Sequence, residues 1–200
     1  MESQFTGRRV RFQQLYYVLD TQYRILWVGG DWDEFALANS GGLARSNEVL
    51  STSLLKHIAD QPTADAVTRL VDVVRSTQLP LRIDYRCDSF SMLRRFQLTI
   101  QPMRDDRVLL VHDLRDARTF DPPLTHWKYR SNANHSKCSF CCSVQTAPDQ
   151  WTPPEDLTEP HPDFVAYTMC PTCSERVEDA IASLLTNSTP KNPVTGGFGP

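Results

Sequence analysis

The chain has 200 residues with a formal net charge of −3 at pH 7; 40% of its residues are hydrophobic and 22% are charged. This composition predicts one large or two small folded domains, and it argues against a strongly basic surface for nucleic acid. No apolar run approaches the roughly 18 residues of a membrane span, and the polar N-terminus MESQFTGRRVRFQQ lacks the apolar stretch of a secretory signal. We therefore expect a cytoplasmic protein with reduced cysteines and no membrane contact.

Charge is unevenly distributed along the chain. Residues 135–187 contain two basic and eight acidic side chains, whereas residues 1–134 contain 18 basic and 16 acidic ones. An acidic C-terminal part behind a nearly balanced N-terminal part indicates two modules with different surfaces.

The N-terminal part begins with two predicted strands and a short helix. The stretches LYYVLD and YRILWVGG are rich in aromatic and branched residues and flank the turn sequence DTQY. Asp31 and Glu34 have the spacing of a capping box, which predicts that a helix starts at this point. The helix is expected to stop at Gly41-Gly42.

A longer helix is predicted over residues 61–78, where Pro62 suits the first turn. Three strands follow at 81–87, 94–101 and 108–113, and their alternation of apolar and polar residues predicts an antiparallel sheet with one covered face. The helix has one apolar stripe, formed by Ala66, Val67, Leu70, Val71 and Val74.

This order of elements resembles a PAS domain over about residues 14–116. RILWVGGDWDEFA is similar to the second strand and first helix of that fold, and RCDS…RRFQLTIQP is similar to a bacterial PAS-like subgroup. SLLKHIADQ occupies the place where such domains often end an apolar segment in His-Pro-Asp, although the proline is missing here. The resemblance implies an α+β fold with a five-stranded antiparallel sheet, flanking helices and a sensory role.

The sequence lacks the features that mark PAS cofactor sites. The helix at 61–78 contains no histidine for a haem, and no segment matches the flavin-binding cysteine motif, so we expect neither cofactor. His57 and His112 are interpreted as structural or surface residues, and Cys87 as a buried, inert thiol. The cofactor-binding residues of this part are therefore unknown.

Arginine is abundant in the strand region between positions 82 and 118. One interpretation is a solvated strand face with cross-strand Arg–Asp pairs. The other is a docking face for an anionic ligand or an acidic partner, which the acidic C-terminal module itself could supply. The residues are Arg82, Arg86, Arg94, Arg95, Arg104, Arg107, Arg115 and Arg118.

Five of the six cysteines lie in the C-terminal part. Cys138-x-x-Cys141 and Cys170-x-x-Cys173 form two CxxC pairs, which can complete a tetrahedral thiolate shell around one metal ion. A segment of about fifty residues buries too little apolar surface to fold readily alone, so a structural metal is physically reasonable. A helix is predicted after the second pair from the spacing of Val177, Ala180, Ile181 and Leu184.

A first pair on a turn and a second at a helix N-terminus resembles a treble-clef zinc finger. The pattern CSFC…W…E…MCPTC is also similar to a small bacterial module found beside sensory domains. The resemblance implies that Trp151 packs near the cysteines, while Glu155 fits by position only.

Zinc is the preferred metal, and iron is the alternative because rubredoxin-type sites also use two CxxC pairs. Those sites typically carry glycine after each pair, where this chain has Cys142 and Ser174. Cys142 is interpreted as a spare thiol, and His135 is a weaker candidate ligand.

The sequence predicts a PAS-like sensory domain at 1–118, a linker at 119–136, a treble-clef-like zinc module at 137–187 and a disordered tail at 188–200. We expect a sensory or adaptor protein whose zinc module contacts a protein partner, with a homodimer through the PAS-like domain left open. A four-thiolate zinc has no open position for water, and no nucleophile constellation or phosphate loop appears, so no enzymatic activity is expected.

Two other functions remain open at this stage. One is a zinc-finger regulator of nucleic acid, which the acidic charge disfavours. The other is a rubredoxin-like iron module for electron transfer. The sequence does not identify the signal, the partner or the oligomeric state.

Overall fold

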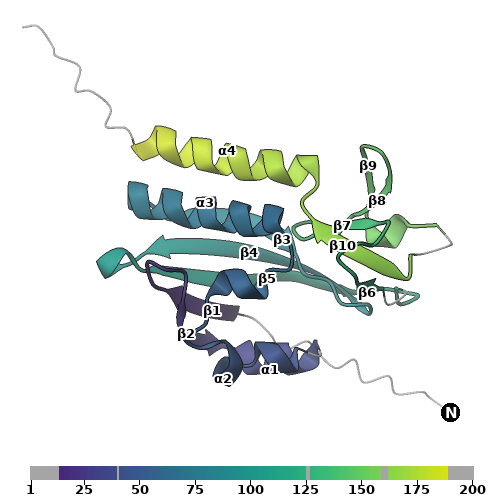
Figure 1. Cartoon of the computed structure of the whole chain (residues 1–200), viewed down its shortest axis with the longest axis horizontal. Coiled ribbons are helices and arrows are strands. Elements are labelled where there is room, and N and C mark those ends of the chain that lie inside the picture. Colours follow the sequence, from purple (N-terminus) through teal and green to yellow (C-terminus); the bar gives the residue numbers. More distant parts are fainter. Residues whose placement is uncertain (1–13, 40, 125–126, 159–161, 189–200) are drawn as a thin grey trace, which may run out of the picture.

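The computed structural model describes residues 14–39, 41–124, 127–158 and 162–188. It has an α+β architecture in which a five-stranded antiparallel sheet and its helices join a second sheet that carries the cysteines (Figure 1). The predicted α+β class and the predicted five-stranded antiparallel sheet are confirmed. The predicted disordered tail, apart from its first residue, lies outside the described residues.

The larger sheet has the strand order β2-β1-β5-β4-β3, and every neighbouring pair is antiparallel. Strands β4 and β5 extend beyond the predicted ranges because they pair along nearly their whole length, from Pro102↔Val108 to Met92↔Thr119. The strands are β1 (Gln14–Leu19), β2 (Ile25–Gly30), β3 (Leu81–Arg86), β4 (Met92–Pro102) and β5 (Val108–Thr119).

Helix α3 (Gln61–Thr77) covers one face of this sheet (Figure 1). It begins as predicted, with Pro62 in the first turn. The carboxylate of Asp60 caps it by accepting a hydrogen bond from the backbone N–H of Thr63 at 2.8 Å. Gln78 closes the helix in the left-handed conformation.

Helix α4 (Pro171–Ser188) lies along α3, on the side away from the sheet (Figure 1). Its predicted apolar stripe belongs to the same hydrophobic cluster as the sheet and α3. Helix α3 is therefore buried on two sides, and besides its predicted stripe it also buries Ala64 and Val73. The core is continuous from the large sheet to the cysteine-rich part.

The first short helix, α1 (Trp32–Ala38), starts where the sequence predicts but ends before the glycine pair. The predicted capping box is wrong: α1 has no side-chain cap, and the Asp31 carboxylate accepts from the backbone N–H of Gln14 at 3.4 Å. Asp33 instead accepts from the backbone N–H and the hydroxyl of Ser46, both at 2.7 Å, because the chain turns back here. The other short elements are η1 (Gly42–Ala44), α2 (Ser46–Val49), η2 (Leu54–His57) and η3 (Arg104–Asp106).

The second sheet has the order β6-β10-β7-β8-β9. Strand β10 runs parallel to both of its neighbours, and β7, β8 and β9 form an antiparallel meander. Strands this short bury little surface, so other forces must hold the sheet. The elements are β6 (Lys128–Tyr129), β7 (Ser136–Cys138), β8 (Val144–Ala147), β9 (Gln150–Thr152), η4 (Pro154–Asp156) and β10 (Phe164–Thr168).

The predicted linker takes part in this second sheet. Strand β6 lies within it, and the ring of Tyr129 stacks on that of Tyr167 with centroids 5.3 Å apart. This aromatic contact ties the segment to β10. The division of the chain into domains at 118 and 137 stays a prediction.

Ion pairs connect the acidic C-terminal part to the arginines of the N-terminal part. The guanidinium of Arg86 binds the carboxylate of Glu155 at 2.9 Å, and Arg69 on α3 pairs with Glu178 on α4. For Arg86, the acidic module therefore supplies the anionic partner that the sequence left open. Arg118 lies in a largely exposed position, as the other interpretation expects, but its partner Asp116 is on its own strand and not on a neighbouring one.

Candidate metal centre

The structure brings together the four cysteines of the two CxxC pairs. The sulfur atoms of Cys138, Cys141, Cys170 and Cys173 all lie within 4.8 Å of one another. A tetrahedral shell with metal–sulfur distances of about 2.3 Å has sulfur–sulfur edges of about 3.8 Å. The Sγ atoms of Cys141 and Cys170 are 3.7 Å apart, so the side chains are spaced for such an ion.

A tight turn presents the first pair. Cys138 ends β7, and its carbonyl accepts a hydrogen bond from the backbone N–H of Cys142 at 3.0 Å. Its own N–H donates to the carbonyl of Ser143 at 2.8 Å, which closes the loop. Cys142 has a φ of 66°, and this left-handed residue turns the chain so that Cys141 faces the cluster while Cys142 does not.

The second pair is presented by the start of α4. Cys170 directly precedes the helix, and Cys173 lies in its first turn. The backbone N–H of Ser174 donates to the carbonyl of Cys170 at 3.0 Å, as expected for the first helical hydrogen bond. Because the N-terminus of a helix favours negative charge, this position suits thiolates.

Hydrogen-bond donors surround the sulfur atoms. The backbone N–H groups of Phe140 and Cys170 each donate to the Sγ of Cys138 at 3.4 Å. The guanidinium of Arg176 approaches the Sγ of Cys173 at 3.9 Å. Donors at these positions stabilise negative charge on thiolate ligands and fix their orientation.

The pKa values of Cys141, Cys170 and Cys173 are displaced by their close neighbours and by burial. Hydrogen bonds with Cys138 and Cys173 lower the pKa of Cys141 well below its usual value. Hydrogen bonds with Cys138 and Cys141 raise the pKa of Cys173, and burial raises that of Cys170 to about 12. Thiolates so close together repel one another, and a divalent cation removes that repulsion.

The fifth clustered cysteine lies outside the shell. The Sγ of Cys142 donates to the carbonyl oxygen of Arg86 at 3.6 Å, and burial raises the pKa of its thiol to about 12. His135 is exposed and does not belong to the cluster. Cys87 lies in the other part of the molecule, is only partly buried, and has a pKa raised by desolvation.

The two remaining candidate histidines have structural environments. His57 is exposed, and its Nε2 lies 2.6 Å from the hydroxyl of Thr52. His112 stacks on Tyr17 with centroids 5.3 Å apart, and its Nδ1 forms a hydrogen bond of 2.8 Å with the hydroxyl of Tyr85. Burial lowers the pKa of His112 to about 4, so the ring is neutral near pH 7.

Four sulfur atoms in a buried cluster suit a structural metal. Cys138, Cys170 and Cys173 are almost fully excluded from solvent. A shell completed by four thiolates leaves no coordination position for water, which metal-assisted hydrolysis requires. Both zinc and iron fit four thiolates. Trp151 is partly buried against the continuous hydrophobic core, and its packing near the cysteines stays a prediction.

Sequence reasoning missed two buried cations. Lys137 is 8% exposed and Arg94 is 3% exposed, whereas the sequence marks both only as members of a charge pattern. The available signal was the position of Lys137 directly before a cysteine ligand on a strand, where successive side chains point to opposite faces.

Comparisons with known proteins do not extend this description. The chain matches no model of a protein family, and no curated protein matches its sequence. Over the described ranges, every helix is too short or too polar to cross a membrane.

Proposed function

We propose that this chain is a cytoplasmic sensory or adaptor protein. In this proposal the five-stranded sheet with α1 to α3 is a PAS-like receiver, and the second sheet with α4 is a zinc-stabilised, treble-clef-like module that contacts a protein partner. The antiparallel order β2-β1-β5-β4-β3 and the flanking helices support the first assignment. The hairpin and the helix that each carry one CxxC pair support the second.

One observation carries the proposal: α4 begins in the metal centre and lies along the helix that covers the receiver sheet. The turn of the first pair contacts the receiver as well. The hydroxyl of Ser139 donates to the Asp60 carboxylate at 2.9 Å, and the N–H of Arg86 donates to the carbonyl of Phe140 at 2.7 Å. A change in the receiver would therefore reach the module through α3 and β3.

The proposal is tested by asking whether the metal module retains a partner. Wild-type chain, Cys173→Ser and the matched control Cys142→Ser are immobilised and exposed to extract from the source cells, and retained proteins are quantified. We expect a protein that wild type and control retain and Cys173→Ser loses. The same retained proteins on all three chains would contradict the proposal.

A further inference from the structure

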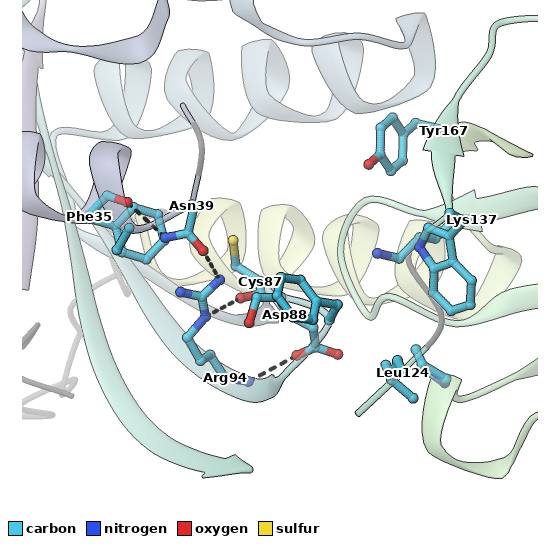
Figure 2. A pocket seen from close by; sticks show the side chains of 13 residues that line it. Phe35, Asn39, Cys87, Asp88, Arg94, Leu124, Lys137 and Tyr167 are labelled. Carbon is cyan, nitrogen blue, oxygen red and sulfur yellow. Dashed lines mark hydrogen bonds between the residues drawn. The ribbon is translucent and has the colours of Figure 1, made fainter. Parts of the chain in front are cut away.

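A cavity of about 350 Å³ lies where the large sheet meets the cysteine-rich part. Figure 2 shows Phe35, Asn39 and Arg94 on one wall and Lys137, Tyr167 and Leu124 on the other. Its volume is near the lower end of the range of about 300–1,000 Å³ for small-molecule sites. Several of its side chains are aromatic: Phe35, Phe90, Trp127 and Tyr167.

Arg94 is held in place at one side of this cavity. Its Nε donates to the carbonyl of Cys87 and its Nη2 to the Oδ1 of Asn39, both at 2.7 Å. The guanidinium also lies over the ring of Phe35, 4.9 Å from its centroid. A cation fixed in this way is preorganised to face a ligand without further loss of side-chain entropy.

Lys137 enters the cavity from the opposite wall (Figure 2). It is paired with Tyr167 in the β7–β10 register and neighbours Cys138, so its side chain points away from the thiol cluster. The ammonium lies 5.4 Å from the ring centroid of Trp127 and 6.0 Å from that of Tyr167. In the described part of the chain it has no hydrogen-bond acceptor and no carboxylate partner.

The acidic groups near the cavity are already paired. The Asp88 carboxylate binds the guanidinium of Arg86 at 2.5 Å and accepts from the backbone N–H of Arg94 at 2.9 Å. Arg86 also holds Glu155. Among the described residues that line the cavity, Arg94 and Lys137 are cations and Asp88 is the single carboxylate, so the lining carries one more positive than negative charge.

We propose that this cavity binds a small monocarboxylate with an aromatic or apolar body, its carboxylate held by Lys137 beside the fixed Arg94. Lys137 is a largely buried lysine with no carboxylate partner in the described ranges, and one bound carboxylate supplies a counter-charge and charge-assisted hydrogen bonds. The aromatic walls suit an apolar body, and a single excess charge suits a monoanion better than phosphate. This inference rests on the proposed function and deepens it by naming the class of ligand held between the receiver and the metal module, but binding is measurable without a partner.

The test uses the full metal-loaded chain and pairs of probes of nearly the same shape, one anionic carboxylate and one neutral amide in each pair. Benzoate, phenylacetate and indole-3-acetate are titrated against benzamide, phenylacetamide and indole-3-acetamide at constant ionic strength, with binding followed in ¹H–¹⁵N spectra. We expect at least one carboxylate to saturate and its amide to bind about ten-fold more weakly, as loss of a charge-assisted contact implies. Inorganic phosphate is expected to bind more weakly than that carboxylate.

Variants at two lysines test whether Lys137 causes the preference for carboxylate over amide. Lys137→Met should remove the preference for carboxylate over amide, and Lys137→Arg should retain it. Lys128→Met is the matched control, because Lys128 is an exposed lysine of the same sheet outside the cavity. Metal content and melting temperature are measured on each variant, so a loss of binding is not mistaken for unfolding.

The inference is overturned if no carboxylate saturates at 10 mM, if acid and amide bind equally, if phosphate binds more tightly, or if folded Lys137→Met keeps the preference. The wild-type comparison of acid and amide decides the matter even if that variant does not fold. If no carboxylate binds, the proposal that the metal module binds a protein partner still stands. If no partner is retained, the carboxylate titration can still be interpreted.

Discussion

The two sheets of this protein are held together in different ways. The larger one has strands of six to twelve residues whose side chains form a core with α3. The smaller one has strands of two to five residues, and its core is made largely of the four cysteines and the helix that follows them. Apolar burial can stabilise the first region by itself, whereas the second depends on sulfur ligands and on docking against α3.

Loss of one ligand is expected to have the largest effect and would separate the two regions most clearly. Cys170→Ser should release the metal and unfold the second sheet, because metal binding supplies on the order of 10 kcal/mol of folding free energy in structural zinc sites. Metal content per chain and ¹H–¹⁵N spectra measure both outcomes. The ¹H–¹⁵N peaks of residues in the larger sheet should remain dispersed, because that sheet is expected to stay folded.

Cys142→Ser and Cys87→Ser are the controls for that experiment. Neither sulfur belongs to the cluster, so metal content should stay at the wild-type value. If Cys142→Ser loses the metal and Cys141→Ser keeps it, the ligand assignment is wrong by one residue. Metal analysis of the wild-type chain also distinguishes zinc from iron, which would colour the protein.

Removing the second region tests whether the first is self-sufficient. A fragment of residues 1–124 should unfold cooperatively, but with a free energy of unfolding lower by about 2–4 kcal/mol, because α4 no longer covers α3. Thermal melting followed by far-UV circular dichroism measures this. A fragment without a cooperative transition would show that the larger sheet also depends on its neighbour.

The pH dependence of stability probes the core of the larger sheet. Desolvation lowers the pKa of His112 to about 4 in the folded state, against about 6.5 in an unfolded chain. The folded state therefore binds fewer protons, and stability that is complete above pH 6.5 falls by about 3 kcal/mol as the pH drops to 4. Asp113, Tyr17 and Tyr85 are the titratable neighbours.

The variant His112→Gln should show a shallower decline than wild type in denaturant titrations between pH 6.5 and 4. Protonation of the metal ligands contributes equally to both chains and cancels in the difference. His57→Gln, at an exposed histidine, should follow the wild-type curve. Equal slopes for wild type and His112→Gln would show that this ring is not kept neutral by burial.

The smallest expected effect concerns the ion pair that links the two regions. A double-mutant cycle with Arg86→Gln and Glu155→Gln should give a coupling of about 1 kcal/mol, because the pair is only partly shielded from water. The cycle of Arg118→Gln and Asp116→Asn is the exposed control, with coupling within about 0.5 kcal/mol. Equal coupling energies in the two cycles would show that the Arg86–Glu155 pair stabilises the contact between the two regions no more than an exposed ion pair does.

The sequence alone determined the local features of both regions. The apolar stripes of α3 and α4 follow from helical spacing, and the antiparallel strands follow from period-two alternation. The four clustered sulfurs also follow from spacing, since each CxxC pair fits one turn or the start of one helix. Apart from the meeting of the two CxxC pairs, which are 29 positions apart, these features depend on residues that are close in the chain. The pairs could still be joined in advance because one metal ion takes four ligands.

Tertiary structure alone decided how the regions meet. The stripe of α4 gave no indication that it would pack on α3, because an apolar face fits any complementary partner. The failed capping box at Asp31 has the same cause, since its carboxylate accepts from the backbone N–H of Gln14, a residue 17 positions away in the chain. The cavity between Arg94 and Lys137 joins residues 43 positions apart, and Lys137 becomes a largely buried lysine only in the folded chain.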